Sequence, residues 1–215
     1  MSWRQLIGAG ISIALIGCAS VTPPATRSVN SSSPPADVVW FTGSSNIRAF
    51  ECRTTQVAVS AEAALEEFER TRADGVPAVK SAAMAIPIRS LDCGIKKMNH
   101  DLYVTLGGDA NPTISFALSN YQVLTRGAPG SVRMNGILRL GGTTNSMVVY
   151  GNVIRAPDGS LRLRGERMID VRDYGVKPPR RFGGLLKVSP EVDVHFDVAV
   201  RPLVDPLGIL TSLLQ

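Results

Sequence analysis

The chain has 215 residues, of which 44% are hydrophobic, 19% charged and 6% aromatic. This composition excludes a wholly disordered protein and supplies enough apolar side chains for the core of one domain. Lysine and arginine number 23 against 18 acidic residues, but the cations are scattered, so we expect no nucleic-acid partner. With only two histidines and three cysteines, most metal sites lack ligands, and we expect no metal site.

The N-terminal segment has the pattern of a secretory signal. One early cation, Arg4, precedes a largely apolar run from Leu6 to Ile16 that is too short to span a membrane as a helix. The run ends in Leu15-Ile16-Gly17-Cys18, which resembles a bacterial lipobox. That resemblance implies that residues 1–17 are a lipoprotein signal peptide and that Cys18 is the lipid attachment site. The alternative is an ordinary signal peptide with a chance cysteine.

An acylated Cys18 implies a protein of the bacterial cell envelope, anchored to the bacterial membrane and facing the periplasm. Ala19, and not aspartate, follows the cysteine, a pattern that resembles outer-membrane sorting. Residues 18–36 are mostly Ser, Pro, Thr and Ala, and such a segment is typical of an unstructured tether. We therefore expect the folded domain over residues 37–202.

The other two cysteines, Cys52 and Cys93, form an even pair in an exported chain. In an oxidising compartment such a pair usually forms a disulfide, which is our prediction here. The alternative is two buried free thiols. We do not expect a catalytic cysteine, because a nucleophilic thiol needs a base and a setting that lowers its pKa.

Most of the domain alternates between apolar and polar residues. The clearest example is residues 192–200, where Val192, Val194, Phe196, Val198 and Val200 share one face. The same period predicts strands over residues 38–50, 52–60, 79–90, 112–124, 132–140, 144–155 and 161–164. One apolar and one polar face is typical of antiparallel strands. About eight such strands favour an all-β barrel or sandwich with a minor helical part.

Short helices are expected at three places. Residues 95–106 carry an apolar residue every three or four positions, before Gly107-Gly108, and predict one helix. Residues 62–72 predict a surface helix or a loop insertion. Asp205-Pro206 is a good helix start, so residues 203–215 predict a short amphipathic helix.

Six segments resemble, in their order and spacing, the motifs of the YceI-like family. They are Trp40–Ile47, Ile86–Leu91, Lys96–Tyr103, Asn111–Phe116, Gly136–Thr144 and Asp170–Val176. The resemblance implies an antiparallel eight-stranded lipocalin-like barrel that binds a polyisoprenoid or a related amphiphile, with no cofactor and no catalysis. The lipobox, residues 61–77 and the two domain cysteines depart from the family pattern. They leave the ligand open between a polyisoprenoid, an isoprenoid quinone and an acyl lipid.

The predicted ligand-binding residues are large apolar side chains on the strands. They are Ile114, Phe116, Leu138, Leu140, Met147 and Phe196. Small residues at Gly136, Gly151, Gly165, Ala82 and Ala117 are consistent with space inside the barrel, although bulges or bends would equally explain the glycines. The candidates for meeting an anionic head group are Lys96, Lys97, Arg180 and Arg181; the alternative for the lysines is a solvated helix face.

We find no catalytic constellation in the sequence. No serine lies in a Gly-x-Ser-x-Gly motif, as an esterase would need. His195 alternates with apolar residues and is expected to face solvent, and Asp170 and Asp173 are expected to cap or pair with Arg172. A second class remains open, an envelope interaction lipoprotein with a filled barrel. The sequence also leaves open whether the protein is a monomer or a homodimer.

Overall fold

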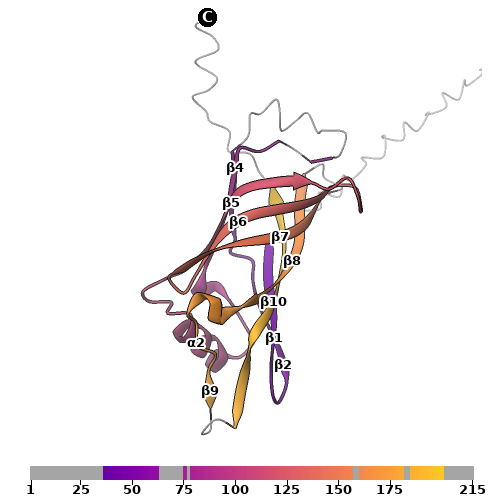
Figure 1. Ribbon diagram of the computed structural model, residues 1–215. Coiled ribbons are helices and arrows are strands. Elements are labelled where there is room, and N and C mark those ends of the chain that lie inside the picture. The colour runs from indigo at the N-terminus through magenta and orange to yellow at the C-terminus, as the bar shows by residue number, and fades with distance from the viewer. Residues whose placement is uncertain (1–35, 63–74, 77, 157–159, 182–184, 201–215) are drawn as a thin grey trace, which may run out of the picture. The chain divides into compact units, whose positions relative to one another are not determined.

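Ten strands form one antiparallel sheet that curls into a half-barrel (Figure 1). The computed structural model describes residues 36–62, 75–76, 78–156, 160–181 and 185–200, and the strand count refers to these residues. The strands are β1 Val38–Ser45, β2 Ala49–Thr54, β3 Ala58–Glu62, β4 Ser81–Pro87, β5 Thr113–Val123, β6 Ser131–Leu140, β7 Thr143–Arg155, β8 Leu161–Asp170, β9 Arg180–Arg181 and β10 Leu186–Val200. The helical segments are η1 Ile88–Ser90, α2 Lys96–Thr105 and η2 Val171–Tyr174.

The expected all-β class is confirmed, but the strand count of eight is too low. The predicted strand 38–50 is a hairpin of β1 and β2, because the chain reverses at Ser45. The Ser45 Oγ donates to the carbonyl of Arg48 (3.0 Å) and accepts from the amides of Ile47 and Arg48 at 3.3 and 3.2 Å. Serine favours such local side-chain bonds in turns.

β2 and β3 follow one another in the sequence but lie at opposite edges of the sheet. The order is β2-β1-β10-β8-β7-β6-β5-β4-β3, with β9 paired to β10. The edge strands β2 and β3 are joined by residues 55–57 alone. Among the described strands, no ladder joins these two edges. The sheet is therefore curled by the chain connection and by packing, and not by hydrogen bonds across the seam.

One end of the half-barrel is closed by the helical segments (Figure 1). Ile88 of η1, Leu106 at the end of α2 and Tyr174 of η2 are buried, and they belong to one hydrophobic core with Leu140 and Val176. The turn after β6 brings these parts together, since a Cβ at Gly141 would contact Val176 and the carbonyls of Leu106 and Tyr174. We call this packed region the closed end.

The predicted disulfide is present between Cys52 and Cys93. It joins β2, an edge of the sheet, to the segment that precedes α2. Arg53 and Asp92 exchange two backbone hydrogen bonds beside it, each 2.9 Å long. The edge strand β2 is therefore held by a covalent bond and a backbone bridge as well as by β1.

Gly136 and Gly165, two of the strand glycines, are covered by aromatic rings and do not create space. A side chain at Gly136 would overlap the ring of Phe116, and one at Gly165 would overlap the ring of Phe196. A glycine in a strand often marks such a close approach. The expectation that these two glycines widen the barrel is therefore wrong.

Several predictions concern residues outside the described part. They are the signal peptide, the tether up to residue 35, the helix or loop at 63–72 and the C-terminal helix at 203–215. In the part that is described, no helix has the length and apolar character that crossing a bilayer requires. The predicted helix at 95–106 is present as α2.

Candidate functional site

An apolar cavity of about 160 Å³ lies inside the half-barrel and is partly open to solvent. By the same measure a single water needs roughly 10–15 Å³, so the cavity has room for much more than one water molecule. Strands β3 to β8 and β10 line it, together with Val76 and Val79 from the segment before β4. Its surface is almost entirely apolar, since Arg167 contributes its aliphatic stem. The hydroxyl of the lining residue Tyr121 accepts a hydrogen bond from the amide of Val79.

The cavity continues the core that fills the closed end. The side chains of the closed end come from η1, α2 and η2, far apart in the sequence, and fill the barrel there. Beyond that plug, the described inward residues are mainly valines, methionines and alanines, which leave the cavity between them. A site built this way binds through shape and apolar surface more than through polar contacts.

Four of the predicted ligand-binding residues line this cavity, namely Phe116, Leu138, Met147 and Phe196. The other two, Ile114 and Leu140, belong to the hydrophobic core but not to the lining. Leu140 is buried at the end of β6, next to the closed end.

Of the two alanines expected to face inward, Ala82 lines the cavity. Ala117 is exposed, because it stands one position from the inward Phe116 on β5, and adjacent residues of a strand point to opposite faces. The expectation for Ala117 is therefore wrong.

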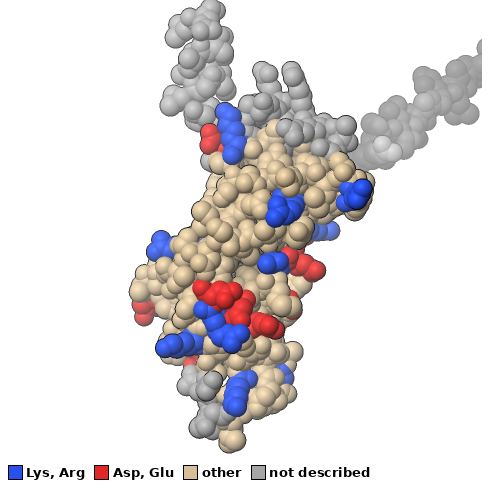
Figure 2. Space-filling model, viewed as in Figure 1, with Lys and Arg blue, Asp and Glu red and all other residues tan. Residues whose placement is uncertain are grey.

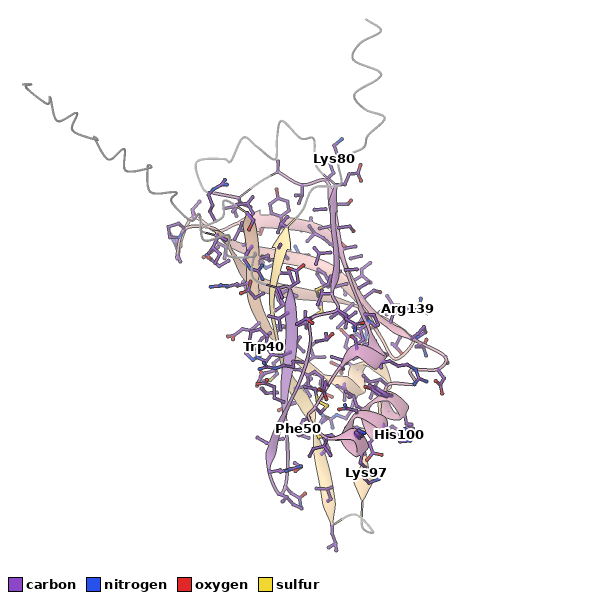
Figure 3. The ribbon with its side chains drawn as sticks, turned by 180° about the vertical axis from the view of Figure 1, so that it is seen from behind. Trp40, Phe50, Lys80, Lys97, His100 and Arg139 are labelled. Atoms are coloured by element: carbon purple, nitrogen blue, oxygen red, sulfur yellow. A yellow bond between two sulfur atoms is a disulfide. The ribbon has the colours of Figure 1, made fainter. Side chains whose placement is uncertain are left out.

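The lysines proposed to meet a head group lie on α2. Lys97 pairs with Asp101 through its Nζ at 3.9 Å, and neither Lys96 nor Lys97 is among the lining residues. In Figure 3, Lys97 and His100 lie at the opposite end of the domain from Lys80, which precedes β4 and follows the lining residue Val79. Arg180 and Arg181 form β9, and their side chains are outside the described part.

Arg167 is a lining residue that the sequence analysis missed. It stands on β8 between the inward positions of Gly165 and Ile169, while its neighbour Met168 is 58% exposed on the outer face. Elsewhere on β8 the charged residues Arg162, Arg164 and Glu166 occupy the alternate positions. At Arg167 and Met168 this arrangement is inverted, since the charged residue is at an inward position and the apolar residue is on the outer face. This inversion is the sequence signal that was available.

Two perturbed groups lie near Arg167, where β8 passes into η2. Burial is the main cause that raises the pKa of Tyr174; the charge of Asp173 also raises it, and the charge of Arg167 opposes the rise. The side chain of Arg172 donates to Asp170 and holds the pKa of that carboxyl below its usual value. Figure 2 shows acidic and basic side chains gathered beside this part of an otherwise largely uncharged face.

The expected pairing of Asp170 with Arg172 is present, with the Arg172 Nη2 and the Asp170 Oδ2 2.6 Å apart. His195 lies away from the cavity. Its ring stacks on Trp40 at 5.1 Å between ring centres, and its Nδ1 lies 3.3 Å from the Glu166 Oε2. The described residues contain no cluster of His, Cys, Asp and Glu that would hold a metal ion.

The comparison with protein families decides the relationship. The family model of the YceI-like domain matches residues 32–200. The chain belongs to the YceI-like family. The match covers the half-barrel and confirms the resemblance seen in the ordered motifs. No curated protein matches the chain significantly.

Several solved structures share the fold. The crystal structure of BcnA from Burkholderia cenocepacia has a TM-score of 0.60 and 17% identity, over 77% of this chain and 96% of that one. The YceI protein of Campylobacter jejuni has a TM-score of 0.53 and 13% identity, over 71% and 85%. A polyisoprenoid-binding domain from Saccharophagus degradans, implicated in plant cell wall breakdown, has a TM-score of 0.53 and 14% identity, over 75% and 91%.

Proposed function

We propose that this YceI-like protein binds a long amphiphilic lipid and holds its apolar tail in the cavity of the half-barrel. The candidate ligands are a polyisoprenoid, an isoprenoid quinone and an acyl lipid. The observation that carries the proposal is the apolar, partly open cavity beyond the closed end. The structural neighbour from S. degradans is described as a polyisoprenoid-binding domain, which supports the same class of ligand here.

The physics of burial favours such a ligand. Removing apolar surface from water is worth about 25 cal/mol per Å², so a contact of roughly 300 Å² stabilises a complex by roughly 7 kcal/mol before the costs of association. The lining supplies this contact from side chains already held in place by the sheet. We therefore propose a function by binding, without a catalytic step.

Filling the cavity tests this proposal. We expect Ala82→Phe to weaken lipid binding by about tenfold, because a ring in the cavity displaces roughly 60 Å² of tail contact, worth about 1.5 kcal/mol. Ala117→Phe is the matched control, since Ala117 is exposed on the outer face of the sheet. Affinity of the delipidated protein for farnesol, measured by calorimetry, would show the difference.

Ala82→Leu places a smaller side chain in the cavity and is the second variant in case Ala82→Phe does not fold. Thermal unfolding of all variants shows whether each one is folded. Equal affinity of the Ala82 and Ala117 variants would contradict the proposal. So would protein that yields no lipid on organic extraction and binds none added. The alternative, an envelope interaction protein with a filled barrel, would then be favoured.

We also propose that the protein is a lipoprotein of the bacterial envelope, anchored through Cys18, with the outer membrane as the expected site. The support is the sequence Leu15-Ile16-Gly17-Cys18. Cys18→Ser should abolish acylation and leave a soluble or uncleaved protein, since a single small change removes the acceptor thiol. Labelling with a palmitate analogue and membrane fractionation measure this. A variant that labels and fractionates like the wild type would contradict the anchor.

A further inference from the structure

Arg167 is the one charged residue among the described residues that line the cavity, and it lines the cavity with its aliphatic stem, while its side chain is exposed to solvent. It stands at an inward position of β8, and the cavity lies against it. The part of the chain that the structure describes contributes no hydrogen bond or ion pair to its guanidinium. Solvent reaches the guanidinium, so the charge is stable without a carboxylate partner from the described residues and stays accessible to an anion from outside.

The other arginines of the same region are paired. Arg162 and Arg164 both donate to the carboxylate of Asp197, at 2.6 and 2.7 Å, and Arg172 pairs with Asp170. All three have an acidic residue placed to receive them. Arg167 therefore differs from these three arginines in having no acidic partner among the residues that the structure describes.

A gap in the sheet gives Arg167 access to solvent. The ladder between β7 and β8 ends at Tyr150 and Glu166, while β7 continues its pairing with β6 down to Thr143. Below this point β7 is held to η2 by the Asn145 Nδ2, which donates to the carbonyl of Asp173 at 2.7 Å. Between these two contacts, residues 146–149 of β7 and 167–169 of β8 are not paired with each other. We call this stretch the side window.

The side window joins the cavity to the outside. Met147 and Val149 on one side and Arg167 and Ile169 on the other all line the cavity, yet Arg167 is exposed to solvent. An exposed side chain whose stem lines the cavity is consistent with an opening at this place. The inverted order of Arg167 and Met168 on β8 places the charge at this opening and the apolar side chain outside, against the rule for the rest of the strand.

We propose that Arg167 binds the anionic head group, a phosphate or a carboxylate, of an amphiphile whose tail occupies the cavity. The head group lies in the side window, where solvent still reaches it. A guanidinium presents two parallel N–H groups that match the two oxygens of such an anion. The inference rests on the proposed lipid-binding function and narrows the ligand to an anionic lipid.

The experiment compares tails with and without a charge. Delipidated full-length protein is titrated with farnesyl phosphate and with farnesol, and separately with palmitate and with hexadecanol. We expect the wild type to prefer at least one anionic partner over its alcohol by about tenfold or more, as charge-assisted hydrogen bonds imply. The phosphate pair and the carboxylate pair then distinguish the two sources of the anion.

Two substitutions assign the preference to Arg167. Arg167→Gln should remove the preference and leave affinity for the alcohols within about twofold, while Arg167→Lys should retain part of it because the charge remains. Arg139→Gln is the matched control, since Arg139 is exposed on the outer face of β6 and projects from the sheet (Figure 3). It should leave the preference unchanged.

The outcomes separate the two proposals. If the alcohols bind but the wild type shows no preference for an anion, or Arg167→Gln keeps it, the role of Arg167 is overturned and lipid binding stands. If neither the alcohols nor the anions bind, lipid binding itself fails. Arg167 is exposed, so the variants should fold, and their thermal unfolding should match that of the wild type.

Discussion

Arg162→Met should lower the free energy of unfolding by about 3–5 kcal/mol, one of the largest effects expected from a single change in this protein. Arg162 is 1% exposed, and its Nε donates to the Asp197 Oδ1 at 2.6 Å. Its Nη2 donates to the carbonyls of Asp197 and Ala36 at 2.9 and 3.1 Å. Without the guanidinium, the buried carboxylate of Asp37 and the largely buried carboxylate of Asp197 lose the positive charge of Arg162.

The network around Arg162 fastens the start of the domain. The Asp37 Oδ1 accepts a hydrogen bond from the amide of Ala199 at 2.7 Å and lies 3.7 Å from the Arg162 Nη1. The residues that precede β1 are thereby tied to β8 and β10. Removing Arg162 should therefore weaken the attachment of the residues before β1 to β8 and β10. It should also remove the positive charge of Arg162 from beside the carboxylate of Asp37.

Urea unfolding followed by circular dichroism measures the difference. Arg164→Met is the control, because Arg164 shares the carboxylate of Asp197 but is 56% exposed, and exposed ion pairs contribute about 1 kcal/mol or less. The slope of the unfolding free energy with urea should be unchanged in both variants. Similar small losses for Arg162→Met and Arg164→Met would show that the buried network does not stabilise the domain.

Removing the disulfide should cost a similar amount. A double variant, Cys52→Ala with Cys93→Ala, should be less stable by about 4 kcal/mol, because the bond closes a loop across a sequence separation of 41 residues and limits the unfolded chain. The loss should be largest for β2, which lies at an edge of the sheet and pairs with β1 on one side only. Urea unfolding of the double variant and the wild type gives the difference.

Reduction provides an independent check on the same bond. Wild-type protein unfolded in the presence of dithiothreitol should lose about the same stability, whereas the double variant should not respond to the reductant. Intact mass before and after reduction should differ by two hydrogens. A wild type whose midpoint is unaffected by reduction would contradict a stabilising role for the bond between Cys52 and Cys93.

The alternation of apolar residues predicted which side of each strand faces the core. It placed Phe116, Leu138 and Phe196 correctly on the cavity side, because a strand's period of two is a local property. It could not say which inward residues touch open space. That depends on the plug at the closed end, whose side chains come from segments distant in the sequence.

Two further features escaped the sequence for related reasons. The glycines at 136 and 165 looked like empty positions, but Phe116 and Phe196, from neighbouring strands, cover them, and a ring's direction across a strand pair is not encoded in one strand's pattern. Arg167 was read as one more scattered cation. The inverted order of Arg167 and Met168 was the signal in the sequence, and the register opposite Val194 on β10 confirms that Arg167 belongs to the inner face.

The seam between β2 and β3 is the place where the half-barrel can change its width. Since no ladder among the described strands crosses the seam, the two edges can move apart slightly without breaking any hydrogen bond of the sheet. The connection at residues 55–57 limits that movement, because three residues span only a short distance between the two strands. Under the proposed lipid-binding function, this movement would let tails of different thickness, linear or branched, fit the same cavity while the ladders of the sheet stay intact.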